Sequence, residues 1–187
     1  MKLYVFRHGE SEDNREHIFS GWRNSPLTDK GRLDALEVAK LLEQKEIKVF
    51  YSPDLDRNRE TVVIVMKNHP GSELIIDNRL RERCYGELQG QKHLDLMNRD
   101  LELYKSYHRS YDVPPPGGES IKDVETRVWP FCEEIVNKIK KDKIDFGVCA
   151  GNNAMRVIRR YFGKLTVEEM LKIENPFDNF FEYEISE

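Results

Sequence analysis

The sequence predicts an α/β fold: a three-layer sandwich around a mostly parallel central sheet, formed by a single domain over residues 1–187. Two patterns support this class. Short apolar runs rich in strand formers alternate with longer segments in which apolar residues recur every three or four positions. Such alternation is typical of a parallel sheet covered by helices. Hydrophobic residues make up 39% of the chain, which suffices for a core without disulfides.

The first half of the chain is expected to contain three strands and two helices. The strands are predicted at Leu3–Phe6, Ile47–Tyr51 and Leu74–Ile76. The first helix begins after Thr28, a residue type that caps helix N-termini, and continues with apolar residues at spacings of three. The second helix is expected to open at Ser52, with serine as the cap and Pro53 in the first turn.

Loops and a proline interrupt the second half. Residues 77 to about 90 are predicted as loop, and His93–Arg109 as a polar helix that ends before the break at Val113–Gly118. A long helix follows over Glu119–Lys141, in which Pro130 should kink or split the rod. The remaining elements are a strand at Asp145–Ala150, a helix at Ala154–Phe162, a helix opened by the capping box Thr166–Glu169, and a strand at Phe180–Ile185.

Composition bears on location and partners. The net charge of -4 gives no general attraction to nucleic acid or to an acidic membrane. The three cysteines are odd in number and lack a C-x-x-C spacing, which favours a reducing compartment. No run approaches the about 18 apolar residues that a membrane span needs, and the N-terminal apolar stretch is too short for a signal peptide. We expect a cytoplasmic protein with neither nucleic acid nor membrane as a partner.

The segment after the first predicted strand carries chemistry suited to phosphate. Arg7 and His8 lie at the carboxyl end of a strand, where parallel sheets bind ligands. A neutral imidazole is a nucleophile toward phosphorus, and a guanidinium holds phosphate oxygens in a fork. Ser11 and Asn14 add neutral donors. Taken alone, the segment also fits a surface histidine beside a chance arginine.

A transferring phosphoryl group needs several cations and a proton donor around it. Arg57 and Arg59 follow the second predicted strand, and either one could converge on the same site with Arg7. Glu82 is the candidate acid in the loop that follows the third strand. Each of these charges could equally belong to a solvated surface, so the residues alone leave the assignment open.

Longer matches point to a family. The segment Arg7-His-Gly-Glu-Ser resembles the signature of the histidine phosphatase superfamily, and four further stretches are similar to its cofactor-dependent phosphoglycerate mutase branch. These stretches are Phe19–Trp22, Arg81–Gly90, Arg109–Pro116 and Gly118–Asp123. The resemblance implies a phosphoglycerate mutase-like fold in which residues 77–118 contribute a cap or substrate-binding insertion. It also implies an isomerase of glycolysis and gluconeogenesis, with dimers or tetramers as the expected homo-oligomer.

The resemblance also implies a role for each matching residue. His8 would be the phosphorylated nucleophile, and Glu82 the general acid and base. The residues implied to bind phosphate are Arg7, Arg57, Ser11, Asn14 and Asn153. The residues implied to bind the substrate are Ser20, Gly21, Arg83, Tyr85 and Arg109. The phosphoryl primer would be 2,3-bisphosphoglycerate, the substrate a small phosphoglycerate, and no metal is implied.

The sequence departs from the family pattern at Gly151. The pattern places a second histidine here, in a segment of the form Ala-His-Gly-Asn-x-x-Arg, whereas this chain reads Ala150-Gly-Asn-Asn-Ala-Met-Arg156. Loss of one donor to the transferring group typically costs about 10²–10³ in rate. Restoring histidine at this position should therefore raise the rate at least tenfold, unless the site has been rebuilt around the glycine.

Two smaller departures concern the substrate. The lysine of the family pattern falls at His93, and a one-residue slip would supply Lys92 in its place. His108 stands where an arginine would precede Arg109, and the chain is short between Pro116 and Gly118, where relatives often carry an insertion. A more open pocket favours hydrolysis.

Three hypotheses follow from these departures: a phosphoglycerate mutase weakened at Gly151, a phosphomonoesterase for small phosphate esters, and a non-catalytic protein that binds phosphate ligands.

Overall fold

The centre of the molecule is a five-stranded sheet in the order β3-β2-β4-β1-β5. The strands are β1 (Lys2–Arg7), β2 (Ile47–Ser52), β3 (Glu73–Ile76), β4 (Asp145–Ala150) and β5 (Phe180–Glu184). All neighbours pair in parallel except β5, which runs antiparallel to β1 at one edge. The computed structural model describes residues 1–186, the side chain of Arg109 excepted. The predicted fold class, a mostly parallel sheet within an α/β fold, is confirmed.

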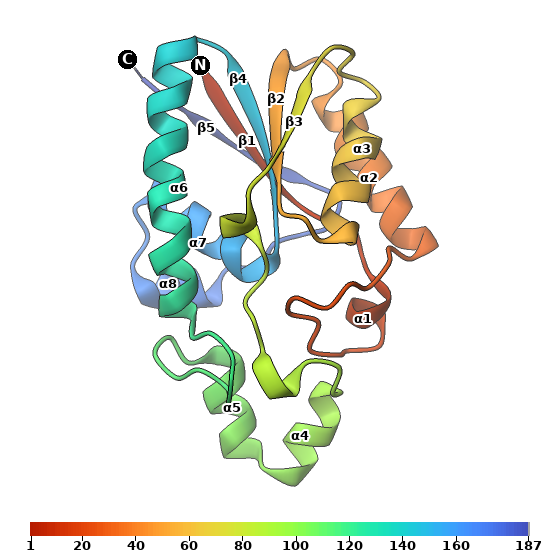
Figure 1. Ribbon diagram of the computed structural model, residues 1–187, viewed down its shortest axis with the longest axis vertical. Coiled ribbons are helices and arrows are strands. Elements are labelled where there is room, and N and C mark those ends of the chain that lie inside the picture. The colour runs from red at the N-terminus through yellow and green to blue at the C-terminus, as the bar shows by residue number, and fades with distance from the viewer. Residues whose placement is uncertain (187) are drawn as a thin grey trace.

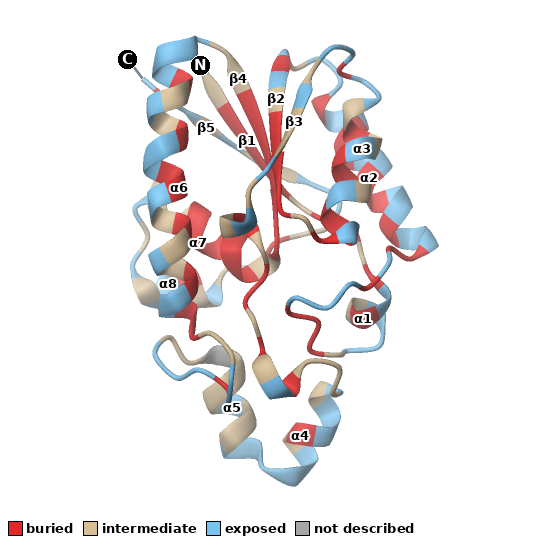
Figure 2. Cartoon of the chain, in the orientation of Figure 1, coloured by how far each residue is buried: buried red, intermediate tan, exposed pale blue. Residues whose placement is uncertain are grey.

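Helices cover both faces of this sheet (Figure 1). The helices α2 (Asp29–Leu42) and α3 (Asp56–Met66) lie on one face, and a cluster around Phe6, Phe50 and Val62 joins them to it. On the other face lie α6 (Ile121–Asp142), α7 (Asn152–Gly163) and α8 (Val167–Lys172), joined by the larger apolar cluster. Figure 2 shows burial concentrated along the inner strands and on the helix faces toward them.

The register of the two central strands brings two predicted segments together. β1 and β4 are parallel neighbours, and Arg7 is paired with Ala150 at their carboxyl ends. Because the next residue of each strand leaves at the same edge, His8 and Gly151 follow side by side. The sheet therefore joins the nucleophile candidate to the position where the family pattern has its second histidine.

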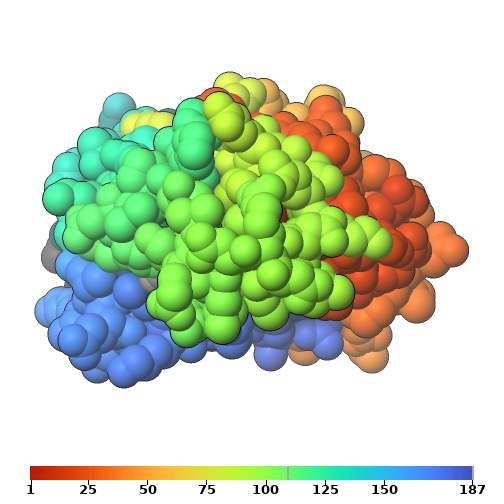
Figure 3. Space-filling model, turned by 90° about the horizontal axis from the view of Figure 1, so that it is seen from below, coloured from red at the N-terminus to blue at the C-terminus, as the bar shows by residue number. Residues whose placement is uncertain are grey.

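A smaller group of elements lies below this edge of the sheet. It contains α1 (Glu12–Arg15), α4 (His93–Arg99), α5 (Leu101–Arg109) and the short 3-10 helix η2 (Gly86–Leu88), while the other 3-10 helix, η1 (Asn78–Leu80), packs against α6. Phe19, Tyr85, Leu88 and Leu96 form a separate apolar cluster here. Seen from below, α4 and α5 spread between the N-terminal and C-terminal parts of the chain (Figure 3). The predicted cap, residues 77–118, includes most of these elements.

Several local predictions are confirmed, and others are wrong. Thr28 caps α2, and the capping box of Thr166 opens α8. The prediction that Ser52 caps α3 is wrong, because the Ser52 hydroxyl donates to the Pro53 carbonyl oxygen and the helix begins only at Asp56. The predicted helix over 93–109 is two helices, since Asp100 adopts extended backbone angles and caps α5.

Pro130 does not split α6, which runs unbroken from Ile121 to Asp142. A proline inside a helix costs roughly 3 kcal/mol, because it removes one backbone hydrogen bond and crowds the preceding turn. Here both Pro130 and Thr126, whose carbonyl loses that bond, are exposed, so water can satisfy the carbonyl. Seven side chains of α6 are buried, which offsets the cost. Among residues 1–186, no helix is long and apolar enough to cross a membrane.

Candidate active site

His8 lies just beyond the end of β1, and its side chain is 2% exposed. Its Nδ1 is 2.7 Å from the Gly9 carbonyl oxygen. A carbonyl can only accept, so Nδ1 carries the proton and Nε2 keeps its lone pair. Burial, followed by the charges of Arg57 and Arg7, lowers the pKa of His8 well below its usual value. The imidazole is therefore neutral at physiological pH, and its unprotonated nitrogen is chemically able to act as a nucleophile.

Arg57 is fixed against that nitrogen. It comes from the first turn of α3 and is 1% exposed. Its Nε lies 3.3 Å from His8 Nε2, while Nη1 and Nη2 donate to the carbonyl oxygens of Arg23 and Gly21, each at 2.8 Å. Three contacts hold the guanidinium plane, so the positive charge is preorganised beside this nitrogen.

Arg7 supplies a second guanidinium. Its Cζ lies 3.9 Å from the centre of the Phe177 ring, and Nη1 donates to the Asn175 carbonyl oxygen at 3.2 Å. Within the described residues, its buried Nε has no hydrogen-bond partner. Burial first, and the charges of Arg156 and Arg57 in addition, lower the pKa of Arg7 to about 10, against the opposing charge of Glu82. The site thus concentrates positive charge, and a bound anion would reduce the repulsion between the guanidinium groups.

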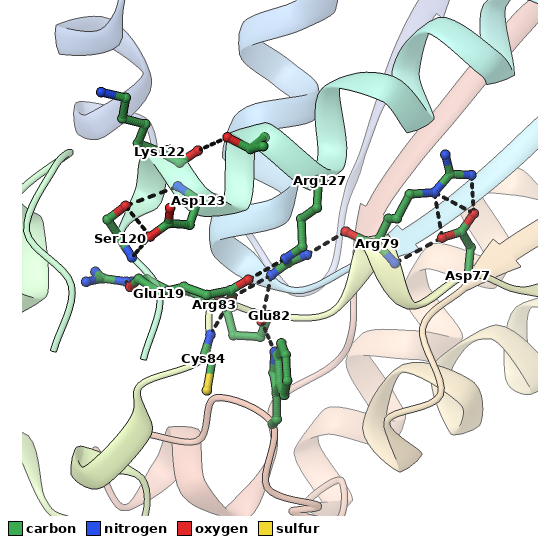
Figure 4. A network of polar contacts seen from close by, with 12 residues as sticks. Asp77, Arg79, Glu82, Arg83, Cys84, Glu119, Ser120, Lys122, Asp123 and Arg127 are labelled. Atoms are coloured by element: carbon green, nitrogen blue, oxygen red, sulfur yellow. Dashed lines mark hydrogen bonds and ion pairs between the residues drawn. The ribbon is translucent and has the colours of Figure 1, made fainter. Parts of the chain in front are cut away.

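Glu82 is the carboxylate nearest these cations. It is 7% exposed, and its Oε1 accepts from the backbone N–H of Arg83 at 2.6 Å and from the Asn153 side chain at 2.9 Å. Hydrogen bonds from α6 fix the loop that carries Glu82. Arg127 of α6 donates to the carbonyl oxygens of Arg79 and Glu82 and pairs with Glu119 (Figure 4). This network positions the Glu82 carboxylate from outside the cavity.

Gly151 packs directly on the backbone of Glu82. A Cβ at this position would lie 2.6 Å from the Glu82 Cα, 2.7 Å from its Cβ and 2.8 Å from its N. Contacts this short do not occur, and main-chain atoms cannot simply turn aside. The space that a histidine side chain would need is therefore occupied by Glu82 itself, which supports the interpretation that the site has been rebuilt around the glycine.

A cavity of about 120 Å³ brings most predicted residues together. Its walls include Arg7, His8, Asn14, Ser20, Gly21, Arg57, Glu82, Tyr85 and Asn153. A larger outer chamber of about 770 Å³ adjoins it and shares Arg7, Tyr85 and Asn153. Among the described residues, no group of three His, Cys, Asp or Glu side chains is arranged to hold a metal ion.

Two predicted residues, Ser11 and Arg83, are buried and line neither space. Ser11 is fully buried, caps α1 and bonds Asn14, so it orients Asn14 instead of reaching a ligand. Arg83 is also fully buried, and it donates to the carbonyl oxygens of Glu119 and Val113, so it supports that loop. The predicted side chain of Arg109 lies outside the described residues.

Lys92 lines neither space, and its role in substrate binding stays a prediction. Lys92 is exposed, and a bridge between Ile18 and Lys92 sets the register of the loop. The next residue, His93, therefore turns inward, lines both spaces and stacks on Phe19, with ring centres 3.8 Å apart. The loop does not slip by the one residue that would place Lys92 at the position of His93.

Sequence reasoning missed several residues of the outer chamber. Arg156 is 4% exposed and lines it, as do Tyr104, His17 and Phe177. Arg156 stands at the arginine of the Ala-His-Gly-Asn-x-x-Arg pattern, so that signal was available. The other three come from α5 and from loops, and their positions carry no pattern that predicts a site.

Comparison with known proteins gives consistent results. The sequence pattern of the histidine phosphatase superfamily (branch 1) matches residues 3–184. A 2,3-bisphosphoglycerate-dependent phosphoglycerate mutase of Allorhizobium ampelinum is 36% identical over 177 residues, which cover 91% of this chain and 83% of the relative. The enzyme of the same name from Brucella ovis is also 36% identical, with 92% of this chain and 86% of the relative covered.

Solved structures show the same fold. YhfR of Bacillus stearothermophilus superposes with a TM-score of 0.86 at 25% identity, covering 99% of this chain and 91% of that one. A putative alpha-ribazole-5'-P phosphatase of Escherichia coli gives a TM-score of 0.82 at 22% identity, covering 97% and 89%. A mycobacterial glucosyl-3-phosphoglycerate phosphatase gives 0.81 at 24% identity, covering 93% and 84%.

Proposed function

This chain belongs to the histidine phosphatase superfamily, and we propose that it is a phosphoglycerate mutase that works through a phosphorylated His8. One observation carries the proposal: His8, whose Nε2 is unprotonated and accepts from Arg57, lines a cavity whose walls also hold Arg7, Arg57 and Glu82. The relatives that are 36% identical over most of the chain carry the mutase name, which supports the finer activity.

In this proposal His8 Nε2 attacks the phosphorus of a phosphate ester, and the bond from phosphorus to the ester oxygen breaks. Arg57 and Arg7 stabilise the charge that spreads over the equatorial oxygens. Glu82 gives a proton to the leaving oxygen, and later takes one from the hydroxyl that attacks phospho-His8. A transfer to the other hydroxyl of glycerate completes the isomerisation of 3-phosphoglycerate and 2-phosphoglycerate.

A bisphosphorylated primer fits the cavity in part. The inner space offers the guanidinium groups of Arg7 and Arg57 for one phosphate. The outer chamber offers Arg156, with His17 and His93, for a second anionic group. We propose 2,3-bisphosphoglycerate as the phosphoryl donor that loads His8, without a metal.

The test is direct. Incubation with 2,3-bisphosphoglycerate should add one phosphoryl group to the intact protein, and the His8→Ala variant should remain unmodified. Conversion of 3-phosphoglycerate to 2-phosphoglycerate should then be measurable in the wild type. If free phosphate accumulates from 3-phosphoglycerate without any 2-phosphoglycerate, the mutase proposal is wrong.

The second candidate is a phosphomonoesterase for small phosphate esters. The observation in its favour is the outer chamber, whose volume of about 770 Å³ exceeds what a three-carbon acid needs. The predicted lysine is also absent from its wall, where His93 stands. A chamber this open admits water to phospho-His8. Faster phosphate release from bulky phosphate esters than from phosphoglycerates would select this activity.

A further inference from the structure

We infer that Asn153 is a positioning residue that seats the Glu82 carboxylate at the start of α7, with Arg156 behind it. The inference rests on the proposed phosphoryl transfer through His8, but it holds for a mutase and for a phosphomonoesterase alike. It assigns Asn153 to the proton-transfer group, whereas the family resemblance implies only a contact with phosphate.

The contacts between Asn153 and Glu82 are short and shielded from water. The Asn153 Nδ2 donates to Glu82 Oε1 at 2.9 Å and to the Tyr85 hydroxyl at 3.2 Å. The backbone N–H of Asn153 lies 3.1 Å from Oε1 and 3.3 Å from Oε2. Asn153 is 4% exposed and Glu82 is 7% exposed. In such surroundings each hydrogen bond is strengthened, and each loss is costly.

Arg156 determines which way the Asn153 amide points. Its Nη1 donates to Asn153 Oδ1 at 3.3 Å, and its Nε donates to the Ile173 carbonyl oxygen at 3.1 Å. A guanidinium has donors only, so the atom that it meets must be the amide oxygen. The amide NH₂ is then left to face Glu82. The chain from Arg156 through Asn153 to Glu82 has one chemically consistent orientation.

Gly151 makes this seat possible. It is the N-cap of α7 and has no side chain with which to accept from the first turn. The Glu82 carboxylate, 71 residues away in sequence from Asn153, accepts from that turn in its place. Partial positive charge at a helix N-terminus favours a carboxylate there. Since any Cβ at 151 would collide with the Glu82 backbone, this position of the Glu82 carboxylate requires glycine at 151.

The experiment separates proton transfer from phosphate binding. Single-turnover phosphorylation of His8 is followed by intact mass in the wild type, Asn153→Asp and Asn153→Ala. Two donors are compared: 2,3-bisphosphoglycerate, whose leaving alkoxide needs a proton, and p-nitrophenyl phosphate, whose leaving phenolate does not. Asn68→Asp is the matched control, because its amide donates to the Ala39 carbonyl oxygen between α2 and α3, away from the cavity.

The expected loss is selective. Both Asn153 variants should phosphorylate His8 from 2,3-bisphosphoglycerate about 100-fold more slowly, within the range that acid catalysis contributes, and from p-nitrophenyl phosphate less than about tenfold more slowly. Asn68→Asp should match the wild type with both donors.

Two other outcomes would overturn the inference. Equal losses with both donors would mean that Asn153 binds the phosphoryl group and does not position the acid. Unchanged rates in variants that melt cooperatively would remove any role. Absence of the adduct in the wild type with both donors would instead refute the proposed function, and the inference with it. If Asn153→Asp fails to fold, Asn153→Ala decides alone.

Discussion

Restoring histidine at position 151 should damage this protein, although the family pattern suggests a gain. The first added atom, a Cβ, would lie 2.6 Å from the Glu82 Cα, whereas ordinary contacts begin at 3.4 Å. One of the two backbones must therefore retreat by about 1 Å, and such overpacking costs about 1–3 kcal/mol of folding free energy. A displacement of this size at a reacting group can cost about 10²-fold in rate.

The assay compares the wild type, Gly151→Ala and Gly151→His. The free energy of unfolding is measured in urea, and the rate of His8 phosphorylation by intact mass. Alanine carries the same clashing atom without the imidazole, so it isolates the steric term. Both variants should lose about 1–3 kcal/mol of stability. The rate should fall in both, by about 10–100-fold for histidine.

A result of the opposite sign would refute this reasoning. If Gly151→His phosphorylates His8 at least tenfold faster than the wild type and unfolds at the same urea concentration, Glu82 does not occupy the histidine's space. The missing histidine would then be a simple loss that the chain never compensated. A faster rate together with a lower free energy of unfolding would show that the backbone moves to accept the side chain. The added imidazole would then increase the rate by more than the displacement of Glu82 lowers it.

The remaining predictions concern the cations, pH and the substrate wall. Arg57→Lys should slow phosphorylation of His8 by about 10²-fold, because an ammonium cannot keep three fixed contacts; equal rates in the two proteins would contradict this. The pKa of His8 is lowered in the folded protein, so on acidification the unfolded chain takes up the proton first. The free energy of unfolding is therefore unaffected by His8 above its unfolded pKa of about 6.5 and decreases as the pH falls below that value. Urea titrations of His8→Gln should show a smaller decrease with falling pH than those of the wild type. His93→Ala should raise KM for the phosphoglycerate several-fold, while Lys92→Ala, its exposed neighbour, should leave KM unchanged.

Local signals in the sequence predicted much of the fold. The strand at Leu3–Phe6 and the caps at Thr28 and Thr166 depend on neighbours within a few residues, and all three occur where the sequence predicts them. Predictions failed where a distant partner decided. Ser52 looks like a cap, but β3 continues alongside it, and the backbone N–H of Asp77 donates to its carbonyl oxygen, so the strand persists to that residue.

The sequence alone determined the sheet class and placed the candidate nucleophile at the end of the first strand, because the pattern of apolar residues and a contiguous motif encode both. Only the tertiary structure decided that His93 and not Lys92 faces the cavity, since a pairing with Ile18 sets that register. Only the tertiary structure, too, set Glu82 against Gly151 and Asn153. No local pattern reports a contact between segments so far apart, because it arises from how a loop and a helix pack around the sheet.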